Sequence, residues 1–130
     1  MKSNLLALFG LTLALLAGPA LAHHSASQYD RARPVVIKGQ VKDMQWSNPH
    51  SWLEIEAGGA AGKRVSWLIE LEGPKVMMRE GWTLHSVLPG DEVTARIMPL
   101  KDGRPGARLV ELQRADGSTF HLFTPRATGV

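Results

Sequence analysis

The chain contains no cysteine. Disulfides, thiolate catalysis and thiol redox chemistry are therefore excluded, and any metal site must use histidine, methionine, carboxylate or the amino terminus. The chain also lacks a strong excess of either charge, because it has 15 basic and 12 acidic residues and a net charge of +3. Such a weak balance argues against a nucleic-acid partner. The sequence also lacks the local signatures of nucleophilic or acid–base catalysis, so we expect no enzymatic activity.

A long apolar run lies at the amino terminus and has no counterpart later in the chain. Lys2 precedes the apolar residues 5–17, and a small-residue cleavage site ends at Ala22. The run is shorter than the roughly 20 residues needed to span a bilayer. We therefore expect residues 1–22 to be a cleaved signal peptide, with no membrane anchor afterwards. The mature chain would begin at His23 and reside in the periplasm.

Period-two alternation of apolar residues predicts a mainly β domain over residues 35–123. Residues 23–34 lack periodicity and are expected to form an extended arm, and residues 124–130 a loose tail. The expected strands cover residues 35–46, 50–56, 64–71, 92–98, 107–114 and 119–123.

Two features of this pattern favour a particular β fold. The apolar residues of the first strand change phase after Val41, which predicts a bulge or bend within residues 39–43. Pro74 predicts a short helix that runs to about residue 80, between the third and fourth strands. Long bent first strands are typical of small closed barrels. We predict an OB-like Greek-key β-barrel of five to six strands, with a β-sandwich carrying one helix as the alternative.

The helical region carries its own expectations. Val76, Met77 and Met78 are the expected buried contacts of the short helix, and residues 83–88 are expected to add one more helical turn. Trp82, just past the helix end, is expected to cap the barrel.

The most specific stretch is Trp-Ser-Asn-Pro-His-Ser-Trp at residues 46–52. Its Asn-Pro step predicts a sharp corner between two strands. With Leu53 facing the core, His50 and Trp52 lie on the opposite, more exposed face. We interpret the glutamates of the neighbouring strands as solvated charges: Glu54, Glu56, Glu70 and Glu72.

Several pieces of the chain together resemble a family of exported bacterial proteins, domain-of-unknown-function family 6152. The pieces are Ala22-His23-His24-Ser25, Tyr29-Asp30, residues 46–52, Gly81-Trp82-Thr83 and residues 89–93. The resemblance covers nearly the whole mature chain. It implies an exported bacterial domain and brings no activity with it.

Copper is the metal that the histidines favour. Cleavage after Ala22 would give His23 a free amine beside its imidazole, and two such nitrogens chelate Cu(II). A third nitrogen would come from His50, or from His24 with its backbone nitrogen. Against this stands a simpler interpretation, in which the two leading histidines are solvated and His50 hydrogen-bonds its own turn. A Cu(I) version would use Met44, although methionine is commonly a core gap-filler.

The rival to a copper carrier is a binding module without metal. Trp46 and Trp52, with Asn48 between them, would form an exposed aromatic face that stacks on a small ligand or on a periplasmic partner protein. Arg64, Glu54 and Glu70 would form its rim.

Overall fold

The computed structural model describes residues 27–122, which form a six-stranded sheet with one short α-helix and one 3-10 turn. The elements are β1 (Val35–Gln45), β2 (Trp52–Gly58), η1 (Ala60–Gly62), β3 (Arg64–Glu70), α3 (Pro74–Arg79), β4 (Glu92–Pro99), β5 (Gly106–Arg114) and β6 (Thr119–His121).

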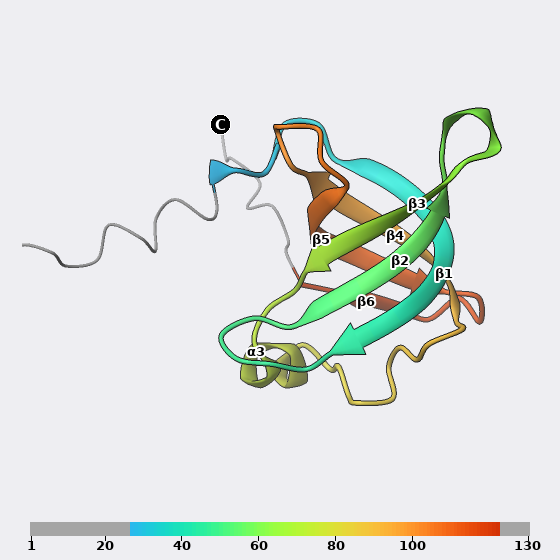
Figure 1. The fold of residues 1–130 in the computed structure, drawn as a ribbon. Coiled ribbons are helices and arrows are strands. Elements are labelled where there is room, and N and C mark those ends of the chain that lie inside the picture. Colours follow the sequence, from blue (N-terminus) through green and yellow to red (C-terminus); the bar gives the residue numbers. More distant parts are fainter. Residues whose placement is uncertain (1–26, 123–130) are drawn as a thin grey trace, which may run out of the picture.

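The sheet closes on itself to form a barrel (Figure 1). Its strands follow the order β3-β2-β1-β4-β5-β6, and a further parallel pairing joins β3 to β5. The first five strands therefore make a closed barrel, and β6 is an extra strand on the edge of β5. This mixed barrel, with its helix between β3 and β4, confirms the OB-like prediction. Closure excludes the β-sandwich alternative.

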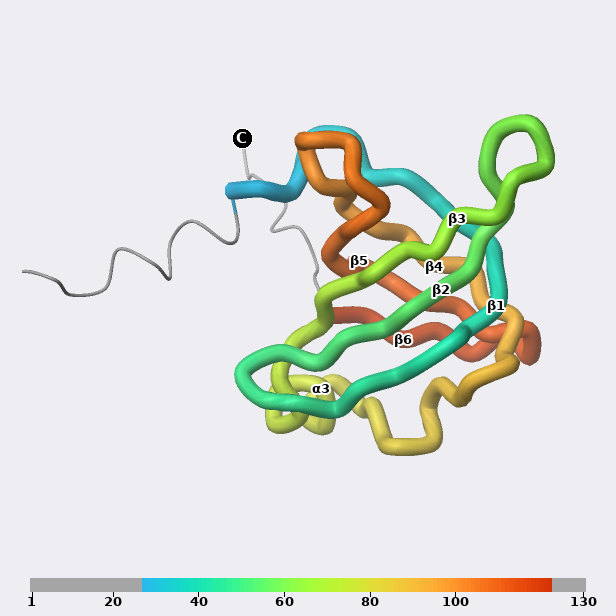
Figure 2. Tube along the Cα trace, in the orientation of Figure 1, coloured from blue at the N-terminus to red at the C-terminus, as the bar shows by residue number. Residues whose placement is uncertain are grey.

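Strand β1 belongs to both halves of the barrel (Figure 2). Its first half pairs with β4 from Val35 to Gln40, and its second half pairs with β2 from Gly39 to Gln45. The register shifts between Val41 and Asp43, which confirms the predicted bulge. At Gly39 the two strands cross so closely that a Cβ would clash with the backbone of β2. The sequence therefore encodes the bend in two ways: through Gly39, and through the change in the phase of the apolar residues after Val41.

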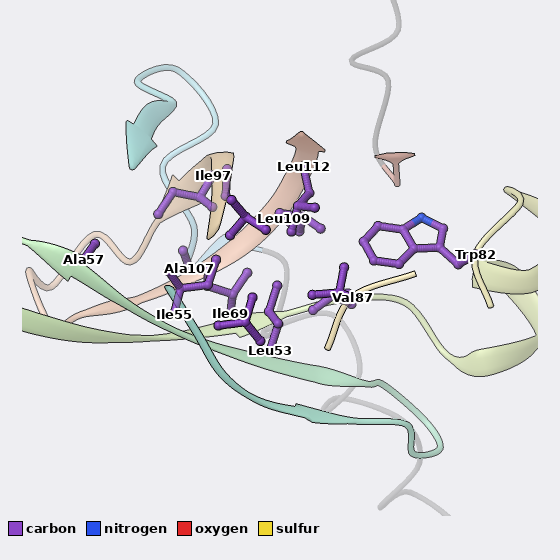
Figure 3. Close-up of a cluster of buried hydrophobic side chains, with 14 of the residues drawn as sticks. Leu53, Ile55, Ala57, Ile69, Trp82, Val87, Ile97, Ala107, Leu109 and Leu112 are labelled. Carbon is purple, nitrogen blue, oxygen red and sulfur yellow. The ribbon is translucent and has the colours of Figure 1, made fainter. Parts of the chain in front are cut away.

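The core is built from the inward positions of the five barrel strands (Figure 3). Leu53, Ile55 and Ile69 are fully buried, as the alternation predicts. Trp82 is also buried and lies at one end of the cluster, where its ring is tilted against Phe120 with centroids 4.9 Å apart. The position of Trp82 at one end of the core agrees with the expectation that it caps the barrel.

The helix prediction was right in position and partly wrong in packing. Pro74 opens α3, and Met77 is its buried residue. Met78, expected inside, is 60 % exposed, because a helix this short turns a single narrow face toward the core. Residues 83–88 form a turn closed by the Ser86 N–H on the Thr83 carbonyl instead of a helix. Among residues 27–122, no helix has both the length and the apolar character needed to cross a bilayer.

Candidate functional site

The corner between β1 and β2 is held by its own hydrogen bonds. The Ser47 hydroxyl donates to the His50 carbonyl over 2.7 Å, and the Ser47 N–H donates to the Ser51 hydroxyl over 3.3 Å. Ser51 is fully buried, and its backbone extends the ladder between β2 and β3. Its N–H donates to the Glu72 backbone carbonyl, and its carbonyl accepts from the Leu71 N–H. These bonds fix the backbone from which the His50 side chain projects.

The corner also lies directly on the segment that leads into α3. The Asn48–Pro49 peptide bond is cis. A Cβ placed on Gly73 would come within 2.6 Å of the Pro49 carbonyl oxygen. Glycine at this position therefore allows the corner to approach the end of β3, where the next residue of the site is located.

His50 is paired with Glu70, the last residue of β3. The imidazole Nδ1 contacts the carboxylate Oε1, and the His50 side chain remains about one-third exposed. Glu70 itself is only 4 % exposed. The interpretation of Glu70 as a solvated charge or a rim residue was therefore wrong. Its side chain does point away from the barrel core, as the alternation requires, but other groups cover it there.

Two further groups contact the Glu70 carboxylate. The Tyr29 hydroxyl donates to Oε2, the oxygen that His50 does not use. Arg108 lies in register with Glu70 on β5, and its Nη1 is 3.8 Å from Oε1. The Arg108 Nη2 pairs with Glu72, which is therefore a half-buried ion-pair partner and not the free charge that we expected. A buried carboxylate needs such partners, since leaving it unpaired would cost several kcal/mol.

Tyr29 is positioned by a small apolar cluster on the outside of the barrel. Its ring packs with Met98 and Val110, which are buried although they face outward from β4 and β5, and with Leu100. Burial, and then the hydrogen bond to Glu70, raise the pKa of Tyr29 above the ordinary tyrosine range. Tyr29 is therefore a neutral donor at physiological pH.

The backbone of the arm is bound to the barrel at the same place. Tyr29 forms an isolated β-bridge with Leu100. The Asp30 N–H donates to the Pro99 carbonyl over 2.8 Å, and the Lys101 N–H donates to the Gln28 carbonyl over 3.0 Å. Figure 1 shows this segment of the arm beside the turn between β4 and β5. The arm therefore lies against the barrel at residues 28–30.

The other residues of the predicted site are distributed over several places. His23 and His24 lie outside the described residues. Trp52 is half-buried on the outer face of β2, in register with Glu70. Trp46 is half-buried against the core instead, and the groove that it lines does not include Trp52. Asn48 is exposed, and Met44 packs against the core.

Trp46 lines an apolar groove beside α3, with a volume of about 500 Å³. Met78 and Leu84, both largely exposed, form part of its wall. The complete lining consists of Trp46, Pro74, Met78, Trp82, Thr83, Leu84 and His85. The groove has the volume of a small-ligand site.

Within residues 27–122, no three histidine or carboxylate side chains converge in an arrangement that would hold a metal ion. His50 could therefore provide one nitrogen, and a metal bound there would need further ligands from residues 1–26 or from solvent. Its Nδ1 already faces Glu70, so Nε2 is the nitrogen that remains for a metal.

Sequence reasoning missed Tyr29 as a site residue, and it missed Arg108 entirely. The sequence did contain a signal for the segment that carries Tyr29, at Met98 and Val110. Both are apolar residues at positions that face away from the core, on neighbouring strands, and such a pair predicts a covering segment. The arm carries the chain's single tyrosine, a side chain with an apolar ring and a polar tip that suits such a site.

The chain belongs to the family of unknown function DUF6152, whose model matches residues 11–108. This confirms the resemblance drawn from the sequence motifs. No curated protein and no solved structure gives a significant match to the chain.

Proposed function

We propose that this member of the DUF6152 family is an exported carrier that binds copper in the periplasm and catalyses no reaction. In this proposal, cleavage after Ala22 makes His23 the first residue of the mature protein. Its amine and imidazole bind Cu(II), and His50 supplies a third nitrogen, with His24 assisting. Nitrogen ligands of this kind suit the tetragonal geometry that Cu(II) prefers.

One observation carries the proposal: His50 is oriented by a buried carboxylate. Histidines that bind metals almost always donate their other ring N–H to a carboxylate, carbonyl or water, which fixes the tautomer and the direction of the ring. The Glu70 carboxylate stands in this relation to the His50 Nδ1. The Nε2 atom, on a side chain that is one-third exposed, is then available to an incoming ion.

The path of the arm makes the amino terminus a reasonable partner for His50. Tyr29 and His50 bind the two oxygens of the same carboxylate, that of Glu70. The Tyr29 hydroxyl is therefore separated from the imidazole by this carboxylate alone. His23 precedes Tyr29 by six positions in the sequence. A chain of that length spans at most about 20 Å. The proposal requires this length, measured from the Tyr29 backbone, to bring His23 to the His50 imidazole.

The test is a Cu(II) titration followed by electron paramagnetic resonance, on protein exported and cleaved naturally so that His23 is its first residue. We expect one ion per chain with nitrogen ligands. Adding a Met before His23 should abolish tight binding, and His50→Gln should weaken it strongly.

A matched control is His121→Gln. The His121 Nδ1 lies 3.1 Å from a carboxylate oxygen of Glu111, so it has a similar pairing, but both partners are more exposed than His50 and Glu70. This variant should bind copper as the wild type does. Weak binding that neither the added Met nor His50→Gln changes would reject the amino-terminal copper site.

The groove beside α3 favours a second function, a metal-free module that binds an apolar ligand or partner. It includes Trp46 of the predicted aromatic face, while Trp52 lies elsewhere. The fluorescent probe anilinonaphthalene sulfonate should bind there, and Leu84→Ser should weaken its binding. Leu68→Ser, at an apolar residue of similar exposure on β3, is the control. Equal losses in both variants would reject the groove as the binding site.

A further inference from the structure

Exposed apolar side chains gather at one end of the barrel. Three of the six large apolar side chains that are exposed among the described residues lie between residues 78 and 88. They are Met78, Leu84 and Leu88, with exposed fractions of 60 %, 65 % and 45 %, hereafter the apolar tip. Figure 1 shows α3 and the loop after it at the end of the barrel opposite the turn between β4 and β5. Single exposed apolar residues are ordinary, whereas a cluster of them marks a binding surface.

The backbone of the loop after α3 is fixed by its own hydrogen bonds. The Ser86 N–H donates to the Thr83 carbonyl over 3.0 Å, and the Thr83 N–H donates to the Ser86 hydroxyl over 2.8 Å. Ser86 and Val87 are buried, while Leu84 and Leu88 on either side of them are exposed. The loop therefore holds its two leucines in the solvent while it anchors the residues between them.

The groove beside α3 covers only part of this surface. Met78 and Leu84 belong to its lining, but Leu88, Lys75 and Arg79 lie outside it. A small apolar ligand in the groove would therefore leave Leu88 in contact with water. An occupant that also covers Leu88 must extend beyond the groove, so it must present a surface of its own.

Two exposed basic side chains lie on α3 beside the apolar tip. Lys75 and Arg79 are four positions apart, so they share one side of the helix. Neither forms an ion pair with another residue in the described part of the chain. Glu80 offsets one of these charges, and the Asp91 carboxylate already accepts from the Leu88 N–H over 2.9 Å. Unpaired positive charge beside apolar side chains fits a surface on which anionic groups border hydrocarbon.

We propose that the apolar tip docks the protein on the surface of an anionic lipid bilayer. This inference rests on the second function proposed above, an apolar binding surface without metal, and it names the partner of that surface. Met78, Leu84 and Leu88 enter the boundary between headgroups and acyl chains. Lys75 and Arg79 extend their charged ends toward the lipid phosphates, as long basic side chains do at membrane interfaces.

The size of the surface favours a bilayer over a protein partner. A stable interface between two proteins takes about 20–30 residues from each side. The apolar tip and its two basic neighbours supply far fewer. A bilayer needs no matching shape, and a few inserted apolar side chains with basic residues beside them are enough for reversible binding.

Vesicle flotation of the naturally exported protein tests the docking. Vesicles of phosphatidylglycerol and phosphatidylcholine should bind the wild type. Leu84→Ser and Leu88→Ser should each lower the partition coefficient about 10-fold, because each removes one leucine from the bilayer. The matched control is Leu68→Ser, at a residue that is 51 % exposed on β3, outside the apolar tip. It should bind as the wild type does, and circular dichroism checks that each variant is folded.

A second set of variants tests the role of charge. Lys75→Gln and Arg79→Gln should each weaken binding to the anionic vesicles about 5-fold, and neither should change binding to pure phosphatidylcholine. Lys101→Gln is the control, at an exposed lysine in the turn between β4 and β5, and it should change neither. High salt should remove the difference between the two kinds of vesicle.

The probe anilinonaphthalene sulfonate separates this inference from the function on which it rests. Probe binding that depends on Leu84, without vesicle binding, would overturn the bilayer and leave the groove as a small-ligand site. A dimer that depends on Leu84 in analytical ultracentrifugation, again without vesicle binding, would overturn the bilayer in favour of a second copy of the chain.

The control variants decide the remaining outcomes. Vesicle binding that Leu84→Ser and Leu88→Ser leave intact, or that Leu68→Ser weakens equally, would also overturn the docking. If neither probe nor vesicles bind in a way that depends on Leu84, the second proposed function falls and the bilayer inference falls with it.

Discussion

Tyr29→Phe offers a clean test of the network around Glu70, because it removes one hydroxyl and keeps the ring. The phenylalanine ring would retain the packing of Tyr29 against Met98 and Val110. Glu70 would lose the donor on Oε2 while keeping its two basic neighbours. Hydrogen bonds to charged groups contribute about 1.5–3 kcal/mol. We therefore expect the free energy of unfolding to fall by about that amount at neutral pH.

Urea unfolding of the metal-free protein measures this loss. With an m-value of about 1.5 kcal/mol per molar, the midpoint should fall by about 1–2 M. Ser66→Ala is the matched control, because it removes a hydroxyl that donates to the exposed carboxylate of Glu54. That change should cost less than about 0.5 kcal/mol. If Tyr29→Phe were as mild as Ser66→Ala, the buried Tyr29–Glu70 bond would contribute nothing special and the reasoning would be refuted.

The same residue predicts how stability depends on alkaline pH. Burial, and then the hydrogen bond to Glu70, raise the pKa of Tyr29 in the folded protein. A raised pKa means that the neutral phenol is stabilised by folding. This contribution is fully present below the unfolded pKa of about 10 and is lost as the pH rises through the higher folded value. The ultraviolet absorbance of tyrosinate reports this site alone, since the chain has one tyrosine. A normal titration near pH 10 in folded protein would contradict the burial of the phenol.

Two glycine substitutions test the architecture that carries the site. Gly39→Ala should lower the free energy of unfolding by about 1–3 kcal/mol, because its Cβ would clash with the Glu56 carbonyl; Gly58→Ala, with open space around it, should change thermal stability little. Gly73→Ala would push against the Pro49 carbonyl, 2.6 Å from its Cβ. We expect a similar loss of stability and a several-fold weaker affinity for Cu(II), while circular dichroism of the sheet is retained.

The barrel could be predicted because the sequence features that specify it each lie within a short stretch of the chain. Period-two alternation assigned Leu53, Ile55 and Ile69 to the core. The phase change after Val41 located the bulge, and Pro74 located the helix. The length and bend of β1, which pairs with two strands, indicated a closed barrel, although not which strands would close it. These features need no knowledge of what packs on the outer surface.

The site could be predicted only in part, because it depends on that outer surface. The corner singled out His50, which lies just before β2 with a side chain that is one-third exposed. The alternation correctly turned Glu70 outward, and outward positions of an antiparallel sheet are ordinarily solvated. The covering of Glu70 comes from Tyr29, more than forty residues earlier in the chain. No periodicity connects two such residues, so the alternation could not report the burial.

The identity of residue 29 carries information that its burial alone would not. A phenylalanine would fill the space against Met98 and Val110 equally well, so packing does not explain the choice of tyrosine. The hydroxyl is needed because the segment that covers the outer face also takes the Glu70 carboxylate out of water, and a buried carboxylate requires donors. Arg108 supplies charge from the neighbouring strand, but Oε2 would remain without a donor if the arm brought only an apolar ring. The arm is therefore matched chemically to the end of β3, and the group to which it is matched is the one that orients His50.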